Sequence, residues 1–130
     1  MNETELKQRT KAFELRVLKL IDAMPDSRSG RVLVGQLGGS ATSVGANYRA
    51  ACRSRSTAEM VSKLAVVEEE ADESAFRLEM MGEHGLVPVS QLDSLLQEAH
   101  ELTAIMVASR RTLSRQREES KIESPKSKIR

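Results

Sequence analysis

The sequence predicts an all-α protein, an up-down-up-down bundle of four helices. Apolar side chains recur every three or four residues in four segments, which is the period of a helix that buries one face. Cap and turn residues separate the segments, so short connections can bring helices of about 20 to 28 residues side by side. The chain has one tyrosine, two phenylalanines and no tryptophan, so we expect an aliphatic core, which favours helices over strands.

The first two helices are predicted over about residues 3–24 and 31–53. Asn2 can cap the first, since Glu5 follows three residues later, a spacing typical of helix starts. Pro25 ends this helix, because the residue before a proline is pushed out of the helical region. The aspartate, serines and glycine that follow favour a turn.

The last two helices are predicted over about residues 57–82 and 91–117. The Ser56 hydroxyl can accept from a first-turn amide while Glu59 reaches back, so a helix begins there. Glycines and a proline close it before the fourth helix starts. Residues 119–130 are rich in lysine, serine and glutamate, too polar to bury anything, and we expect them to be a disordered tail.

Residues 36–56, QLGGSATSVGANYRAACRSRS, are poor in large apolar side chains and could be a phosphate-binding loop. Such a loop needs Gly-x4-Gly-Lys-Ser/Thr after a strand, whereas Gly38, Gly39 and Gly45 have another spacing and no lysine lies in the segment. The phosphate loop is therefore excluded. Each glycine inside a helix costs about 1 kcal/mol relative to alanine, so we expect close approach of a neighbouring helix as compensation.

Three polar residues are candidates for contacts between helices. Ser40 and Asn47 are seven residues apart on one face of the second helix, and they either bond across the bundle or lie at the edge of its apolar stripe. Glu68 sits one turn from Leu64 in the third helix, so it is a candidate for partial burial and pairing with an arginine.

The second and third predicted helices resemble a known family. Residues 36–81 are similar to a core written Q-L-x-x-S-A-x-S-[IV]-x-x-N-[IY]-x-E-A, which a Ser-x-x-[EDF] helix start follows. This core is typical of bacterial four-helix-bundle proteins found in, or named for, intervening sequences of 23S ribosomal RNA genes. With Phe13 and Leu20 the resemblance spans most of residues 1–115, and this chain has Ala50 where the family often has glutamate.

The resemblance implies a left-handed bundle, a homopentamer and no known catalytic role. Relatives of this fold include the accessory protein of diversity-generating retroelements, a barrel-like pentamer that binds a reverse transcriptase and nucleic acid. Self-association, and a nucleic acid or a nucleic-acid-processing protein as partner, are thus expectations that the resemblance supplies.

Metal and catalytic sites are not expected. The acidic run at residues 68–73 could suggest a di-iron bundle, but such sites need Glu-x-x-His pairs. His84 falls in a predicted turn and His100 has Gln97 three residues before it, so an exposed acidic face is the favoured interpretation. Cys52 has no histidine near it in sequence and the serines form no nucleophile elbow. We therefore expect neither an enzyme nor a cofactor.

Charge is segregated along the chain. Lys and Arg total 20 against 19 Asp and Glu, a balance unlike that of a dedicated nucleic-acid binder. Residues 25–55 nevertheless carry five arginines against one aspartate, and residues 56–83 carry two basic against eight acidic residues. These segments would attract each other within a bundle or between the subunits of a ring.

A basic rim is the candidate surface for nucleic acid or a partner. Its affinity for phosphates would fall steeply with salt, and the alternative is that its arginines form ordinary surface ion pairs. The three aromatic residues, Phe13, Tyr48 and Phe76, lie on or near apolar stripes, which disfavours sequence-specific recognition of single strands. The candidate rim residues are Arg49, Arg53, Arg55, Arg110, Arg111, Arg115 and Arg117.

The function expected from these observations is a non-catalytic, oligomeric interaction module, a homopentameric ring that docks protein or nucleic-acid partners through charged surfaces. The alternative is a protein whose main activity is sequence-nonspecific RNA or DNA binding. A single cysteine, no apolar run of about 18 residues and no signal-like start indicate the cytoplasm and no membrane.

Overall fold

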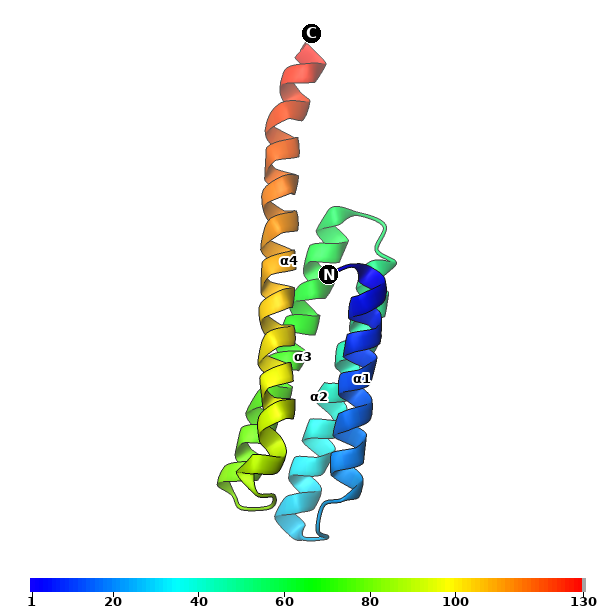
Figure 1. Ribbon diagram of the computed structural model, residues 1–130. Coiled ribbons are helices and arrows are strands. Elements are labelled where there is room, and N and C mark those ends of the chain that lie inside the picture. The colour runs from blue at the N-terminus through cyan, green and yellow to red at the C-terminus, as the bar shows by residue number, and fades with distance from the viewer. Residues whose placement is uncertain (130) are drawn as a thin grey trace.

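Four antiparallel helices make up the structure, a computed structural model that describes the backbone of residues 1–129 and the side chains of residues 1–122. The chain runs alternately down and up through the four helices, so each lies antiparallel to the next (Figure 1). The predicted all-α bundle is confirmed, and its left-handed twist stays a prediction. The helices are α1 (Glu3–Asp22), α2 (Arg28–Cys52), α3 (Thr57–Glu83) and α4 (Val89–Ile129).

Side-chain caps fix the starts of the first three helices. The Asn2 side chain accepts from the Glu5 amide at 2.8 Å, and Ser56 accepts from the Glu59 amide at 3.1 Å. Ser27 caps α2 by accepting from the third helical amide at 3.0 Å, so α2 begins at Arg28, three residues before the predicted start. A serine cap satisfies an amide that has no partner inside the helix, which is why each helix begins where it does.

A glycine turn ends α3 and sets the angle at which α4 returns. Gly85 has φ +80°, a conformation that side chains other than hydrogen disfavour. The Leu86 amide donates to the Met81 carbonyl at 3.0 Å and the Gly85 amide donates to the Gly82 carbonyl at 3.1 Å, which is the Schellman pattern. Gly82 then lies against α4, where a Cβ would come 3.2 Å from Leu92.

The core is aliphatic and narrow. Stripes from all four helices meet along the bundle axis, with Phe13 as the one fully buried ring in the part of the chain with described side chains. Small residues let the backbones approach: a Cβ at Gly38 would lie 3.4 Å from Ile21, so α1 and α2 are in contact there. The largest fully buried side chains are Phe13, Leu37, Leu64, Leu78, Met81, Leu102 and Met106.

The end of the chain differs from the sequence-based prediction. Residues 119–130 were expected to be disordered, but α4 continues to Ile129 as a rod that rises beyond the other helices (Figure 1). Arginine, glutamate, glutamine and lysine are good helix formers, which favours a polar helix without a core, and α4 continues through Pro125, a residue that disfavours a helix interior. The exposed side chains of residues 115–122 confirm the absence of burial there. We call residues 115–129 the α4 extension.

Two substitutions on α2, two residues apart, are expected to act in opposite directions. Leu37→Ala removes a fully buried side chain and should lower the free energy of unfolding by about 2–5 kcal/mol. Gly39→Ala should raise it by about 0.5–1 kcal/mol, because its Cβ meets nothing within 4 Å and alanine is the better helix former. Urea unfolding at one fixed, low protein concentration measures both, and a destabilised Gly39→Ala would contradict the open environment of that residue.

Candidate interaction surfaces

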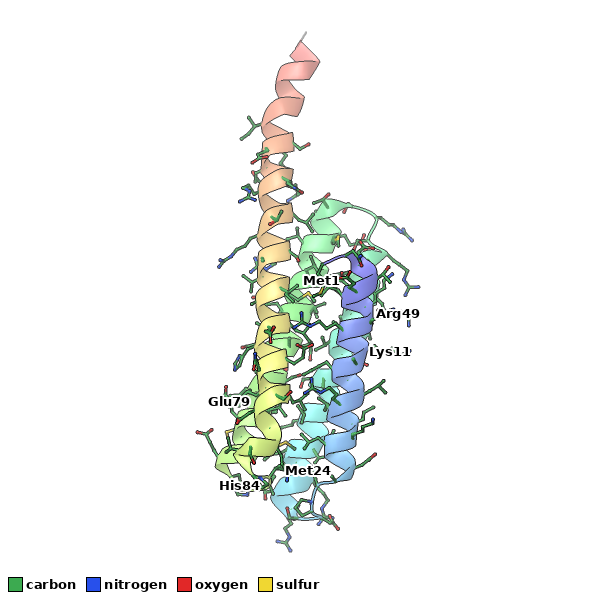
Figure 2. All side chains as sticks on the ribbon, viewed as in Figure 1. Met1, Lys11, Met24, Arg49, Glu79 and His84 are labelled. Carbon is green, nitrogen blue, oxygen red and sulfur yellow. The ribbon has the colours of Figure 1, made fainter. Side chains whose placement is uncertain are left out.

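One end of the bundle gathers cationic side chains. Figure 2 places Met1, Lys11 and Arg49 toward this end, and His84 and Met24 at the opposite end. The start of α1, the end of α2 and the start of α3 all meet at the first end, and α4 passes beside them on its way to the α4 extension.

The predicted rim arginines divide into two groups. Arg110 donates from Nε to Glu68 Oε1 at 2.9 Å, a pair in which both side chains are about three-quarters buried, so it links α4 to α3. Within residues 1–122, no carboxylate lies within ion-pair distance of the other rim arginines. The ordinary ion pair therefore accounts for Arg110 and leaves six arginines unneutralised: Arg49, Arg53, Arg55, Arg111, Arg115 and Arg117.

The three candidate inter-helix residues behave differently. Ser40 is buried, and its hydroxyl lies 3.0 Å from that of Ser74, a bond between α2 and α3. Asn47 instead donates to the Ser43 carbonyl at 2.7 Å within its own helix. Glu68 makes the contact to Arg110. Ser40 and Glu68 thus connect helices, and Asn47 lies at the edge of the stripe.

A contact that the sequence did not reveal joins α1 to α4. Arg9 donates to the Glu98 carboxylate from Nη2 at 2.6 Å and from Nε at 2.8 Å, and Glu101 lies 3.2 Å from Nη2. The hydrogen bonds that Arg9 donates to these carboxylates raise its pKa, so it stays charged. A bidentate arginine of this kind is a strong, directional bond. The spacing of Glu98 and Glu101 on one helix face was the available signal, but nothing in the sequence paired it with Arg9.

A groove between α1 and α2 has a mixed lining. Its volume is about 370 Å³, and Lys7, Lys11, Arg49 and Glu14 are among the residues that line it. The Glu14 carboxylate accepts from the Gly45 amide at 2.6 Å, and a Cβ on Gly45 would collide with it. Burial raises the pKa of Glu14, against the opposing effect of bonds from backbone amides. Glu14 was missed because it lies at the border of an apolar stripe.

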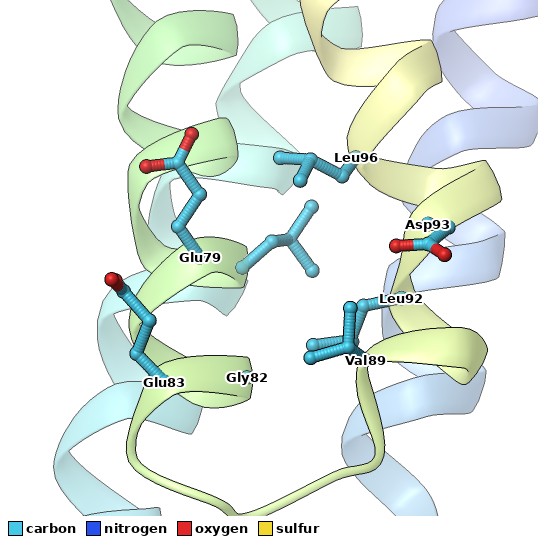
Figure 3. Close-up of a pocket in the computed structure, with 8 residues that line it drawn as sticks. Glu79, Gly82, Glu83, Val89, Leu92, Asp93 and Leu96 are labelled. Carbon is cyan, nitrogen blue, oxygen red and sulfur yellow. The ribbon is translucent and has the colours of Figure 1, made fainter.

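An apolar pocket lies between α3 and α4 near their connecting turn (Figure 3). Its volume is about 230 Å³, and its walls are Leu78, Val89, Leu92 and Leu96. Carboxylates stand at its rim, among them Glu79. Its lining combines these apolar walls with the acidic residues Glu79, Glu83 and Asp93.

Residues with reactive side chains are dispersed. Cys52 is half-buried beside Tyr48. Burial of Tyr48 and the neighbouring Cys52 thiol raise the pKa of the Tyr48 hydroxyl. His84 Nε2 lies 2.9 Å from the Ser29 hydroxyl, and His100 lies 3.6 Å from Glu79. Among the described side chains, no three histidine, cysteine or acidic groups are close enough to share a metal ion. No helix in the described part is both long and apolar enough to span a bilayer.

Two helices present unusual faces to solvent. Phe76 is 51% exposed, so the prediction that it lies near the apolar stripe is wrong; it points outward, with the Arg77 guanidinium 5.2 Å from its ring centre. The α3 outer face consists of Ser62, Val66, Glu69, Glu73, Phe76, Met80 and Glu83. The α2 outer face consists of Arg28, Arg31, Val32, Gly35, Gly39, Thr42, Ala46, Arg49 and Arg53.

The fold and these surfaces define a four-helix-bundle protein with charged outer faces. The family described as 23S rRNA-intervening sequence protein matches the chain over residues 2–108. The chain belongs to this family. Arg110 and the α4 extension lie beyond the matched region.

A solved structure supports the fold. It is the crystal structure, at 1.70 Å resolution, of a protein with unknown function from the S23 ribosomal protein family of Bacteroides thetaiotaomicron VPI-5482. The TM-score is 0.79 at 24% identity, over 85% of this chain and 99% of that one. No curated protein matches the chain.

Replacing the groove carboxyl is expected to make stability less dependent on pH. A carboxyl whose pKa is raised in the folded state binds its proton more tightly there, so stability falls as pH rises from the unfolded to the folded pKa. Glu14→Gln keeps an acceptor for Gly45 and removes the charge. We expect the variant to be more stable than the parent at neutral pH and to lose that advantage in acid. Urea unfolding at several pH values measures this, and an advantage that does not change with pH would contradict it.

Proposed function

We propose that the protein is a non-catalytic interaction module that assembles as a homo-oligomer, a ring such as a pentamer, and docks protein or nucleic-acid partners through its charged surfaces. The observation that carries the proposal is charge left unneutralised on the surface. Six rim arginines make no ion pair with the described carboxylates, whereas Arg110 of the same rim pairs with Glu68.

Exposed apolar side chains support self-association. Val32 is 58% exposed, and Leu15 and Phe76 are each 51% exposed. Single exposed apolar residues are normal on a monomer, but here they stand on outer faces that have no partner within the bundle. The resemblance to a pentameric relative adds to this, since a ring covers such faces by repetition.

The oligomeric mass is the first measurement. Light scattering coupled to gel filtration, at micromolar concentration and low salt, is expected to give a mass several times that of the 14.4 kDa chain. A chain that elutes at the mass of one subunit over the whole concentration range would contradict the proposal.

Direct nucleic-acid binding is the second candidate, and the position of the arginines favours it. Arg49, Arg53 and Arg55 end α2 and the turn after it, and Arg111, Arg115 and Arg117 lie on α4 at the same end of the bundle. In the described residues α2 and α4 are not in contact, so these are two separate basic groups, and phosphates bind each irrespective of sequence. Phe13 and Tyr48 are buried and Phe76 is the one exposed ring among the described side chains, so there is little aromatic surface for base stacking.

Two double variants separate specific from diffuse attraction. Arg115→Ala with Arg117→Ala removes two cations from the basic end, and Arg16→Ala with Lys19→Ala removes two from α1 as the matched control. Single-stranded RNA should be retarded in low salt and released by about 0.3 M. The first variant should reduce the slope of log K against log salt by up to about 1.4, and the control should leave it unchanged. Equal effects, or no retardation of the parent, would dispose of this candidate.

A further inference from the structure

The outer face of α3 is both apolar and acidic. Val66 is 39% exposed and Met80 36%, on either side of the half-exposed Phe76 ring. Glu69 and Glu73 are exposed among them. Nothing within the bundle covers this face, since α3 meets α2 and α4 through its other sides. Large apolar side chains gathered on one open face are typical of an interaction surface.

The outer face of α2 has the complementary character. No acidic residue occurs anywhere in α2, and arginines stand at both ends of the face. Its middle is flat, because a Cβ at Gly35 or Gly39 would meet no atom within 4 Å. Glycine inside a helix costs about 1 kcal/mol relative to alanine, and the bundle contains no neighbour that makes these two glycines necessary.

We infer that the outer face of α3 of one copy packs on the outer face of α2 of a second copy, with Phe76 against the glycines of α2. The inference rests on the proposed homo-oligomer and names its interface. A second copy is the occupant that the observations favour, because the same chain supplies an acidic apolar face and a basic flat face of nearly equal length.

The register follows from a contact inside the subunit. The Ser40–Ser74 bond sets these two residues at one height along the bundle. Counting in opposite directions from this pair puts Phe76 level with Gly38 and Gly39, and Met80 level with Gly35 to within one residue. Rotation about an axis parallel to the bundle keeps every height, so these pairs also face each other between neighbouring subunits of a ring.

The charges agree with this register. Counting from the same serine pair places Glu83 level with Arg31. Arg49 lies about one helical turn from the height of Glu69, within reach of a long side chain. Opposite charges at the border of an apolar contact steer association and fix the alignment. In its own subunit Arg31 has two long contacts from Nε, each at 3.4 Å, to the exposed Asp26 carboxylate and to the Ser27 carbonyl, which leaves its Nη groups available.

Such a contact is heterologous, because it joins two different faces. Each subunit would keep one free α2 face and one free α3 face until the assembly closes into a ring or continues as a filament. The competing occupant of the α2 outer face is a phosphate backbone, which its arginines would also attract.

Disulfide trapping tests the register directly. Two variants are made in a Cys52→Ala background. One carries Gly35→Cys, and the other carries Met80→Cys together with a mass tag that distinguishes the two chains. Mild oxidation of the mixture should give mixed dimers in about tenfold or greater excess over dimers of either variant with itself, because a disulfide needs Cα atoms within about 7 Å. A mixture of Gly35→Cys with Ala104→Cys, on an exposed part of α4, is the control.

A steric variant tests the same face in solution. Gly39→Leu improves helix propensity and places a bulky side chain where Phe76 should pack, so the association constant should fall about tenfold or more. Ala104→Leu is the matched control and should leave association unchanged. Circular dichroism reports whether each variant is folded, and the trapping experiment decides the question if Gly39→Leu is not.

The outcomes distinguish failure of the proposed function from failure of the interface alone. A parent chain that is monomeric removes the proposed function and this inference together. An oligomeric parent that tolerates Gly39→Leu, or whose mixed disulfides do not exceed the control, overturns only the interface. If Gly39→Leu leaves the mass unchanged and abolishes RNA retention, the α2 outer face binds nucleic acid and the inference is likewise overturned.

Discussion

The shared burial of four aliphatic stripes is the constraint on which the structure depends. Because the described core contains only one fully buried ring, it cannot fill wide spaces, so the helices must lie close together. Gly38, Gly45 and Gly82 answer this need, since each stands where a neighbouring helix or its side chain comes near. Between α2 and α3, the Ser40 and Ser74 hydroxyls lie within bonding distance, which fixes the height of α2 against α3.

Sequence patterns were sufficient for the helices and insufficient for what joins them. Periodicity and cap residues are local signals, which is why Asn2 and Ser56 could be recognised as helix starts. The extent of α4 escaped prediction because a polar segment that contains a proline, Pro125, is more typical of a disordered tail than of a helix, and composition alone does not decide between the two.

Contacts between helices that are far apart in sequence depend on the register of the two helices and on which faces they turn toward each other. No local sequence pattern encodes either. Arg9 and Glu98 are 89 residues apart, and only the assembled bundle brings them together. The same is true of Glu14, whose partner is a backbone amide on α2 that has no residue-specific signature. Phe76 was misplaced because one residue on a helix changes direction by about 100°, enough to move a ring from the border of a stripe to solvent. The rim arginines stay a prediction, made from a local excess of positive charge along the chain.

The α4 extension gives the molecule two unlike ends. In a ring whose subunits all point the same way, every α4 extension would project from the same side. The opposite side would present only the turns between helices. A long partner that binds on this side would contact several α4 extensions at once. Individually weak contacts then reinforce one another through high local concentration, so avidity would depend on the number of subunits more than on any single side chain.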